Sequence, residues 1–481
     1  MRWVESRVRR SGDKATRPRW RDTKLTEMTQ AQASRLSSST RVGLTCASVG
    51  VIYGYDLSII AGAQLFITDD FGLTTSQQEL LSAMAVIGQI AGALGAGVLA
   101  NAIGRKKSVV LILVAYAAFA LLGAFSVALP MLLAARLLLG LTIGVMVVVV
   151  PVYVAESAPA SVRGALLTTY QLTIVSGLIL GYLAGYLLAG TQSWRLMLGL
   201  AVVPVMLLLP LVIRLPETAR WYLLKGRADD ARRALLQVEP AANADEELAE
   251  IARAVSEGSG GISEMLRPPY LRATLFVIAL GFLIQITGIN AIVYYSPRIF
   301  EAMGFTGNFA LLALPALVQV AGLAAVGAAL TLVDRVGRRP ILLCGIAMMI
   351  AADILLTAVF AQGIGGAALG FAGILLYIIG YTLGFGSLGW VYASESFPTR
   401  LRSIGSSTML ASNLIANAII AAVFLTMLHS LGGAGTFAVF GVLAIIAFGF
   451  VYRYAPETKG RQLEEIRHFW ENGGRWEDQC P

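Results

Sequence analysis

Residues 131–154 read MLLAARLLLGLTIGVMVVVVPVYV, an apolar run with one charged side chain, Arg136. An α-helix rises 1.5 Å per residue, so this run is long enough to cross the roughly 30 Å hydrocarbon core of a bilayer. The whole chain of 481 residues has the same character, with 57% apolar and 14% charged residues. A soluble enzyme could not bury that much apolar surface, so the composition predicts a polytopic membrane protein.

Eleven further stretches have a similar length and composition, and together they predict twelve transmembrane helices. A charged segment, residues 216–271, divides them into two sets of six. We therefore expect an all-α membrane protein with an N-terminal bundle at 42–215 and a C-terminal bundle at 272–454. The spans are predicted near 42–66, 78–100, 108–129, 131–154, 165–189, 196–215, 272–296, 309–333, 340–361, 366–394, 403–428 and 434–454.

The segments outside the two bundles are polar. Residues 1–41 hold no apolar run and carry seven of the eight net positive charges, so we interpret them as a disordered basic tail. Residues 216–271 include two charged stretches of helical periodicity, 228–236 and 245–255, which predict short amphipathic helices at the membrane surface. Residues 455–481 form a second polar tail.

The distribution of Lys and Arg predicts the orientation, because cytoplasmic loops of membrane proteins are rich in these residues. With both termini inside, 34 of the 37 basic residues lie in cytoplasmic loops, tails or helix ends, whereas the opposite orientation reverses that ratio. We therefore expect a multi-pass protein of the cell membrane, surrounded by lipid, with both termini in the cytoplasm. Binding of nucleic acid is not expected, because the excess of positive charge is confined to one tail.

Few residues are available for metal or covalent chemistry. The chain has three cysteines and two histidines, which are scattered along the sequence. It lacks the spacings typical of metal sites, catalytic serines and phosphate-binding loops. We expect no enzyme activity, no metal and no cofactor.

Three short motifs occur twice, once in each half, at nearly the same separation. The pairs are NAIGRK at 101–106 and DRVGRR at 334–339, VYVAESAP at 152–159 and VYASESFP at 391–398, and PET at 216–218 and 456–458. This regularity indicates a duplicated six-helix unit. Such a duplication places a substrate site between the halves, near the middle of the membrane.

With several other strings, these motifs give the chain a resemblance to the sugar porter family of the major facilitator superfamily, from about residue 42 to 465. Each string is weak alone, but their order and spacing together are specific. The resemblance implies the major facilitator fold and a monomeric carrier that moves a sugar by alternating access. The further strings are GYD at 54–56, QLTI at 171–174, QITGIN at 285–290 and PETKG at 456–460.

Asp56 and Arg136 are ionisable residues within predicted spans, where an unpaired charge costs about 2.5–3.5 kcal/mol on insertion scales. We therefore expect Arg136 to have a carboxylate partner. In the resembled family these two residues are close, and the acid at the position of Asp56 binds the proton of symporters. Relatives that carry sugar without protons often have Asn there. The alternative is a static ion pair that joins the first and fourth spans.

Amide side chains in the middle of spans suit the hydroxyl groups of a sugar, because each amide offers a donor and an acceptor. The candidate substrate-binding residues are Gln171, Gln285, Asn290, Trp390 and Asn413. The four amides match sugar contacts of the resembled family, and the indole could stack on the apolar face of a sugar ring. Asn417 shares a helical face with Asn413. Any one amide could instead form an interhelical hydrogen bond.

The chain also departs from the family pattern near this site. Sugar carriers often have polar or aromatic side chains near the positions of Ile284, Gly322, Thr382 and Leu414. Losing hydrogen-bonding groups there changes the discrimination between hydroxyls. A hexose is favoured, while a pentose, a polyol or a less polar glycoside stays open.

Charged residues at the ends of spans are predicted to gate the transport path. Opposite charges there can pair between neighbouring helices and close the cytoplasmic side, although membrane anchoring and helix capping would place the same residues. The candidates are Glu156, Arg163, Glu217, Arg220, Asp334, Arg335, Glu395 and Arg402. Tyr294 and Tyr295, toward the outer end of the seventh span, either cover the site from outside or form an aromatic belt at the interface.

Asp353 is a further acid within a span and has no counterpart in the family pattern. It is an acid facing a wet cavity, a residue at a misplaced span edge, or a second titrating group.

Our interpretation of the whole sequence is a secondary transporter that imports a sugar with a proton. The alternatives are a passive facilitator of the same fold, a sugar-sensing receptor without transport, and an exporter of unrelated compounds.

Overall fold

The structure is a computed structural model that describes residues 40–158, 160–238, 243–256, 261–362, 366–461, 463–474 and 476. All regular elements in this part of the chain are helices. Eleven helical stretches are long and apolar enough to cross a membrane. The last of them, Leu401–Tyr454, contains two spans that meet at Gly432, where φ is 69° and ψ is 175°. The prediction of an all-α membrane protein with twelve spans is therefore confirmed.

The N-terminal bundle contains six spans. The first covers Thr40–Phe71, and the sixth is divided into two shorter helices. The elements are α2 Gly50–Phe71, α3 Thr75–Ile103, α4 Arg105–Ala124, α5 Leu129–Ser157, α6 Ala160–Leu188, the 3-10 turn η1 Ala189–Thr191, α7 Trp194–Gly199 and α8 Val202–Ile213. Within the bundle α2 packs against α6, and α3 packs against α5.

The C-terminal bundle repeats this plan with more interruptions. The seventh span of the chain is broken into two helices, and π-helical turns lie in the eighth and tenth spans. The elements are α13 Leu271–Ile286, α14 Ile289–Ala302, η2 Phe309–Ala313, α15 Leu314–Val336, α16 Arg338–Gln362, α17 Gly366–Tyr381, η3 Thr382–Gly386, α18 Ser387–Glu395 and α19 Thr399–Tyr454. Both α13 and α16 pack against the long helix α19.

Short helices occupy the segment between the bundles and the C-terminal tail. They are α9 Ala219–Leu224, α10 Ala228–Val238, α11 Ala244–Ser256, α12 Ile262–Met265 and α20 Leu463–Glu471. Helices α10 and α11 lie where charge and periodicity predict amphipathic helices. Helix α20 lies in a segment for which no element is predicted, and its Trp470 packs on Phe276 of α13 with ring centroids 5.0 Å apart. Most of the predicted basic tail, residues 1–39, lies outside the described part of the chain.

The first span is longer than its apolar run. It is predicted to end near residue 66 but continues to Phe71. Gly72, with φ of 60°, ends the helix as a left-handed cap. In the added turn Asp70 accepts hydrogen bonds from Trp194 Nε1 at 2.9 Å and from Arg195 Nη1 at 3.0 Å, which tie the first span to the sixth.

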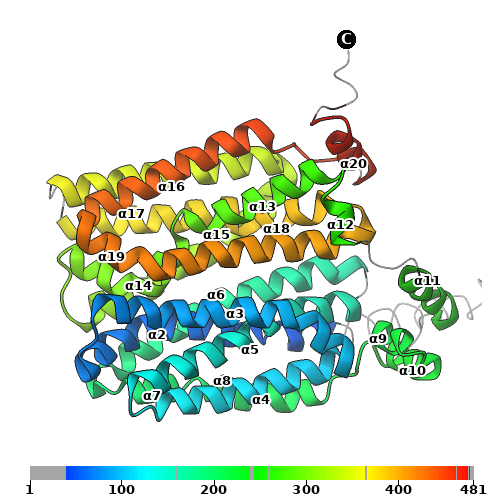
Figure 1. The fold of residues 1–481 in the computed structure, drawn as a ribbon, viewed down its shortest axis with the longest axis horizontal. Helices are drawn as coiled ribbons and strands as arrows, with labels where there is room; N and C mark the ends of the chain where they lie inside the picture. The colour runs from blue at the N-terminus through cyan, green and yellow to red at the C-terminus, as the bar shows by residue number, and fades with distance from the viewer. Residues whose placement is uncertain are drawn as a thin grey trace, which may run out of the picture.

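The two bundles lie side by side with their helices running in roughly the same direction. Figure 1 shows the N-terminal bundle, mostly in blue and cyan, below the C-terminal bundle, whose colours run from green to red. Helices α9, α10 and α11 protrude at one end of the spans. We call this end the linker face and the opposite end the far face. The turns at Gly104 and Gly337 belong to the linker face, and those at Gly72 and Gly432 belong to the far face.

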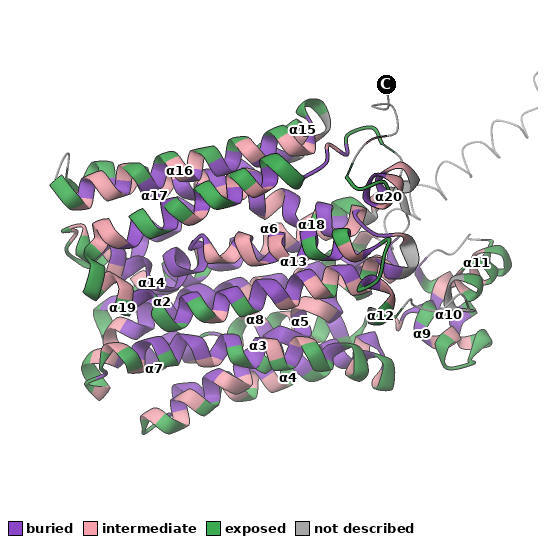
Figure 2. Cartoon of the chain, turned by 45° about the horizontal axis from the view of Figure 1, so that its top comes forward, coloured by how far each residue is buried: buried purple, intermediate pink, exposed green. Residues whose placement is uncertain are grey.

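Large apolar side chains are exposed around the outside of both bundles. Figure 2 shows exposed residues along outer helices such as α4 and α16. Leu111 and Val114 of α4 and Ile354 of α16 are among them. Soluble proteins rarely expose large apolar patches, whereas lipid tails accept them, so this outer surface suits a bilayer.

Candidate functional site

Asp56 of α2 and Arg136 of α5 form an ion pair in the interior of the N-terminal bundle. The guanidinium Nη1 donates to the two carboxylate oxygens at 3.1 and 3.3 Å. Tyr116 of α4 adds a hydroxyl donor to Asp56 Oδ1 at 3.4 Å. All three side chains are buried. The carboxylate partner expected for Arg136 is therefore Asp56.

The charge of Asp56 holds this three-helix contact together. Removing one partner of a buried ion pair leaves an uncompensated charge, at a cost of about 3–5 kcal/mol. Arg136 Nε is already buried without a hydrogen-bond partner among the described residues. A proton on Asp56 would remove the negative charge that holds the guanidinium. The arrangement can therefore respond to protonation by changing how α2, α4 and α5 pack.

The seventh span is broken at a glycine that lies between Gln285 and Asn290. Gly288 has φ of 105°, a left-handed conformation in which α13 ends and α14 begins. The ring of Phe440 lies only 2.7 Å from where a Cβ of this residue would be. The two predicted binding amides therefore belong to two different helices of one span.

The break also frees a backbone carbonyl from the helical ladder. Thr287 lies in the broken turn, and its carbonyl oxygen accepts a hydrogen bond from the Tyr377 hydroxyl of α17 at 2.7 Å. Both residues are buried. This bond fixes the broken turn against the tenth span.

Two amide contacts connect the seventh span to α19. Gln285 Nε2 donates to Asn413 Oδ1 at 3.1 Å, and Asn417 Nδ2 donates to the Tyr294 hydroxyl at 3.2 Å. Asn413 and Asn417 thus face the same neighbour, as their four-residue spacing predicts. In each pair one amide oxygen accepts no hydrogen bond from a described residue. Gln285 Oε1 and Asn417 Oδ1 are buried and have no hydrogen-bond partner within the described ranges, a situation that is rare in proteins.

The other predicted binding residues are not joined to this amide pair. Gln171 on α6 is half-buried and Asn290 on α14 is buried, and neither side chain forms a hydrogen bond to a described residue. Trp390 on α18 is 42% exposed. The structure therefore links Gln285 directly to Asn413. The side-chain amides of Gln171 and Asn290 are not engaged with described residues, and the ring of Trp390 is partly exposed.

Tyr294 and Tyr295 lie at a kink of α14 and are buried. Tyr295 has a non-helical backbone, with φ of −121° and ψ of 18°, and its hydroxyl donates to the carbonyl of Ala421 at 2.8 Å. The two residues are only 3% and 1% exposed. An interfacial aromatic belt would require exposed rings, so that interpretation is wrong for both tyrosines.

Hydrogen bonds between the two halves gather at the far face. Glu79 of α3, which is 4% exposed, accepts bonds from the backbone N–H and the hydroxyl of Thr426 on α19, at 2.6 and 2.8 Å. Tyr182 of α6 donates to the carbonyl of Val293 on α14 at 2.6 Å. We call these two contacts the far-face clasp.

Sequence reasoning missed Glu79. It lies one residue inside the predicted start of the second span, where charged residues are common because helices leave the membrane there. Only the burial of Glu79 against the C-terminal half distinguishes it from an ordinary charged residue at the membrane interface. Tyr116 was also missed, since a tyrosine within an apolar span gives no sign of the carboxylate it faces.

At the linker face, Glu156 and Glu217 hold basic groups of the N-terminal half. Arg105 contacts Glu156 through two hydrogen bonds, Nε to Oε2 at 3.0 Å and Nη2 to Oε1 at 3.1 Å. Arg220 lies farther away, at 3.9 Å from Glu156. Glu217 accepts the backbone N–H groups of Arg105 and Lys106 at 3.0 Å, so it caps the N-terminus of α4.

Glu457 repeats the arrangement of Glu217 in the C-terminal half. Its carboxylate accepts the backbone N–H groups of Arg338 and Arg339, at 3.0 and 3.1 Å, and caps the N-terminus of α16. The two caps thus occupy equivalent places in the duplicated unit.

The remaining predicted gating residues are less well defined. Glu395 lies within electrostatic reach of Arg402. Arg335 is exposed, and the side chains of Arg163 and Asp334 lie outside the described part of the structure. The linker-face contacts described above join neighbouring helices within one half.

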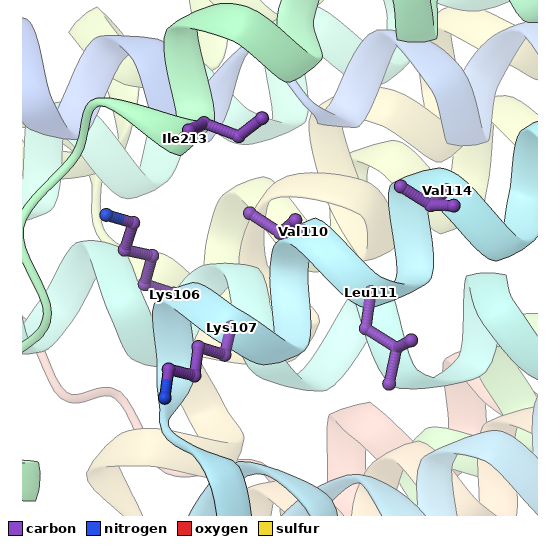
Figure 3. Close-up of a pocket in the computed structure, with 6 residues that line it drawn as sticks. All are labelled: Lys106, Lys107, Val110, Leu111, Val114 and Ile213. Atoms are coloured by element: carbon purple, nitrogen blue, oxygen red, sulfur yellow. The ribbon is translucent and has the colours of Figure 1, made fainter.

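A shallow depression of about 380 Å³ lies on the outside of the N-terminal bundle, between α4 and α8. Figure 3 shows its lining, which consists of Lys106, Lys107, Val110, Leu111, Val114 and Ile213. Aliphatic side chains dominate it, and it contains none of the amides described above. It therefore suits a lipid chain better than a sugar.

The chain matches known transporters over most of its length. The profile of the family described as sugar (and other) transporter matches residues 42–470. The galactose-proton symporter of Escherichia coli K12 is 36% identical over 425 residues, which cover 87% of this chain and 92% of the relative. Polyol transporter 5 of Arabidopsis thaliana is 31% identical, with 90% of this chain and 86% of the relative covered.

Solved structures of similar proteins have the same fold. The inward open conformation of the xylose transporter of E. coli is 25% identical and has a TM-score of 0.77, covering 91% of this chain and 100% of the other. A proton:xylose symporter bound to 6-bromo-6-deoxy-D-glucose is 25% identical with a TM-score of 0.76, covering 90% and 99%. The chain therefore belongs to the sugar porters of the major facilitator superfamily, a family of membrane transporters and not of enzymes.

Proposed function

We propose that this protein imports a sugar together with a proton, by exposing one central site alternately to the two sides of the membrane. The buried ion pair between Asp56 and Arg136 carries the proposal. An acid held by a cation inside a membrane bundle changes its charge by taking up a proton, and a passive facilitator needs no such acid. The names of the relatives support this reading, since they include proton symporters for galactose and for arabinose.

The ion pair gives the bundle two arrangements that differ in protonation. When Asp56 is ionised, it holds Arg136 and keeps α2 and α5 together. When Asp56 is protonated, the guanidinium is released and the helices can repack. A sugar that binds more tightly to one arrangement is then coupled to the proton, because each ligand shifts the same equilibrium.

The amides supply the chemistry for a sugar. Gln285 and Asn417 each present an unpaired buried oxygen, and sugar hydroxyls are donors that would satisfy them. Gln171 and Asn290 add donors and acceptors that are not engaged with described residues. A hexose is the favoured substrate, and Trp390 would stack on its apolar face.

We also propose that the linker face is cytoplasmic and that the protein is a monomer. The bias of Lys and Arg toward the linker-face loops supports this orientation. With this orientation the far-face clasp would close the outer side, as an inward-facing state requires. The charge clusters around Glu156 and Glu395 would help to close the cytoplasmic side in the opposite state.

Transport into proteoliposomes tests the proposal. Uptake of labelled D-galactose, D-xylose, L-arabinose and myo-inositol is measured with and without an inward proton gradient. Asp56→Asn mimics the protonated acid, so it should exchange sugar across the membrane without concentrating it. Asp69→Asn, which changes an exposed acid at the end of the same helix, is the matched control and should concentrate sugar like the wild type.

Coupling at Asp56, the facilitator and the receptor are told apart by different outcomes. Concentration of sugar by Asp56→Asn in response to the gradient would refute coupling at this residue. A wild type that equilibrates sugar but never concentrates it would be a facilitator. Binding without exchange would identify a receptor.

A further inference from the structure

Asp353 is a second acid in the interior of the membrane bundle, in the half opposite to Asp56. It lies on α16, about 22 Å along the helix from Arg338 at the linker face. Its exposed fraction is 0%, and neither carboxyl oxygen has a hydrogen-bond partner in the described part of the chain. Its position well within the span rules out a misplaced span edge. Its burial rules out an acid that faces a wet cavity in this conformation.

The helices that pack against α16 bring no charge to this depth. Gly441 of α19 lies directly opposite, so close that a Cβ there would be 3.3 Å from Asp353 Cβ. The twelfth span contains no charged residue between 434 and 451, and η3 contains none. The charges of α15 and the arginines of α16 belong to the linker-face ends of these helices. Of the two tyrosines on α17, Tyr377 and Tyr381, the first is close enough to Asp353 to interact electrostatically.

An ionised carboxylate in this place would be buried without a cation or a donor. Burying an unpaired charge costs far more than burying a neutral acid, so the group binds a proton instead. We propose that Asp353 is a second proton-binding site of the carrier, filled as a neutral carboxylic acid in this conformation. The inference deepens the proposed symport function, on which its transport consequences rest. The protonation state of Asp353 itself follows from the packing alone.

Tyr377 connects this acid to the sugar site. Its hydroxyl is engaged with the carbonyl of Thr287, in the broken turn between Gln285 and Asn290. In a conformation of the transport cycle that admits water to Asp353, the acid can give its proton to that water, and the new carboxylate attracts the Tyr377 hydroxyl. The Thr287 carbonyl then loses its donor, and the broken turn is no longer fixed. Loss of the proton from Asp353 should therefore weaken sugar binding.

Infrared difference spectroscopy tests the protonation state without a sugar. Spectra of purified full-length protein at neutral minus strongly alkaline pH should contain a carboxylic-acid carbonyl band that disappears in Asp353→Asn. Asp69→Asn, the exposed control, should keep this band. The inference is overturned if Asp353→Asn removes only carboxylate bands at neutral pH. Should Asp353→Asn not fold, Asp353→Glu keeps an acid at the site and should move the band instead of removing it. An unmoved band would equally overturn the inference.

Binding of D-galactose tests the connection to the sugar site. The measurements use Asp56→Asn protein, so that the first acid cannot titrate. Affinity should fall roughly tenfold between neutral and alkaline pH, because a buried carbonyl loses its bond. It should not fall in the double variant Asp56→Asn/Asp353→Asn. An equal fall in both variants would refute the connection. Absence of binding to any sugar of the panel would refute the proposed function, while the infrared result on Asp353 would stand.

Discussion

Replacing Glu79 by Gln should open the far face. The Glu79 carboxylate is buried and accepts two hydrogen bonds from Thr426, at 2.6 and 2.8 Å. Hydrogen bonds to a charged group contribute about 1.5–3 kcal/mol each. Gln keeps one acceptor oxygen and loses the charge, so we expect the clasp to lose about the value of one such bond. At 1.4 kcal/mol per factor of ten, the open fraction should rise about 10- to 100-fold.

Thiol labelling measures this open fraction. Ser82 is buried on α3, close to Glu79 along the helix, and Ser82→Cys places a thiol beneath the clasp in a protein whose three native cysteines are replaced by serine. The labelling rate with an impermeant reagent, applied to the far face of the membrane, is proportional to the open fraction while that fraction is small. Glu79→Gln should raise the rate by the factor given above.

Two further variants decide whether the clasp is the cause. Thr426→Val removes the hydroxyl but keeps the backbone N–H, so its effect should have the same direction and a smaller size. Asp69→Asn removes an exposed acid at the same face and should leave the rate unchanged. An unchanged rate in Glu79→Gln would refute the idea that this contact holds the far face closed.

Three other predictions follow from contacts described above. Gly104 and Gly337 have positive φ, 102° and 116°. In Gly104→Ala the new Cβ would lie 2.3 Å from a capping oxygen of Glu217, and in Gly337→Ala it would lie 2.6 Å from one of Glu457. Each substitution should therefore lower the free energy of unfolding by about 1–3 kcal/mol, which a thermal melt measures. Gly97→Ala, which meets nothing within 4 Å, is the control, and a matching loss there would point to a general helix effect. Gln171→Ala and Asn290→Ala should each weaken sugar binding about tenfold in calorimetry without lowering the melting temperature, and unchanged affinity in both would remove them from the site. Cysteines introduced near residues 20 and 470 should resist impermeant thiol reagents applied outside intact cells, and labelling of either would reverse the orientation.

The spans could be predicted from sequence because length and apolarity decide them. A run such as 131–154 has one stable solution in a bilayer, in which all backbone groups bond within the helix. Their ends were less predictable. The first span gains a turn up to Phe71 because Asp70 finds partners on the sixth span, which lies more than a hundred residues away. Helix α20 escaped prediction because its apolar side chains are too few to stand out without their contact on α13.

Partners of site residues could be predicted where a charge requires an opposite charge. They could not be predicted where helix packing determines which side chains meet. Arg136 inside a span demanded a carboxylate, and Asp56 was the available one. The contact between Gln285 and Asn413 joins residues 128 positions apart, so spacing alone could suggest both residues but not their bond. The same limit hid Glu79, since its partner Thr426 belongs to the other half. Contacts between the halves are set by the relative rotation of two rigid bundles, which no local pattern records.

The far-face clasp gives the carrier an expected response to temperature. Closing the clasp strips water from the Glu79 carboxylate, and opening it restores that hydration shell. Hydration of a charged group orders water, so its free energy becomes less favourable on warming. The population of the closed state should therefore increase relative to that of the open state as temperature rises. In a cold membrane the same molecule would spend more of its time open at the far face, so the resting state of the carrier would depend on the temperature at which the cell grows.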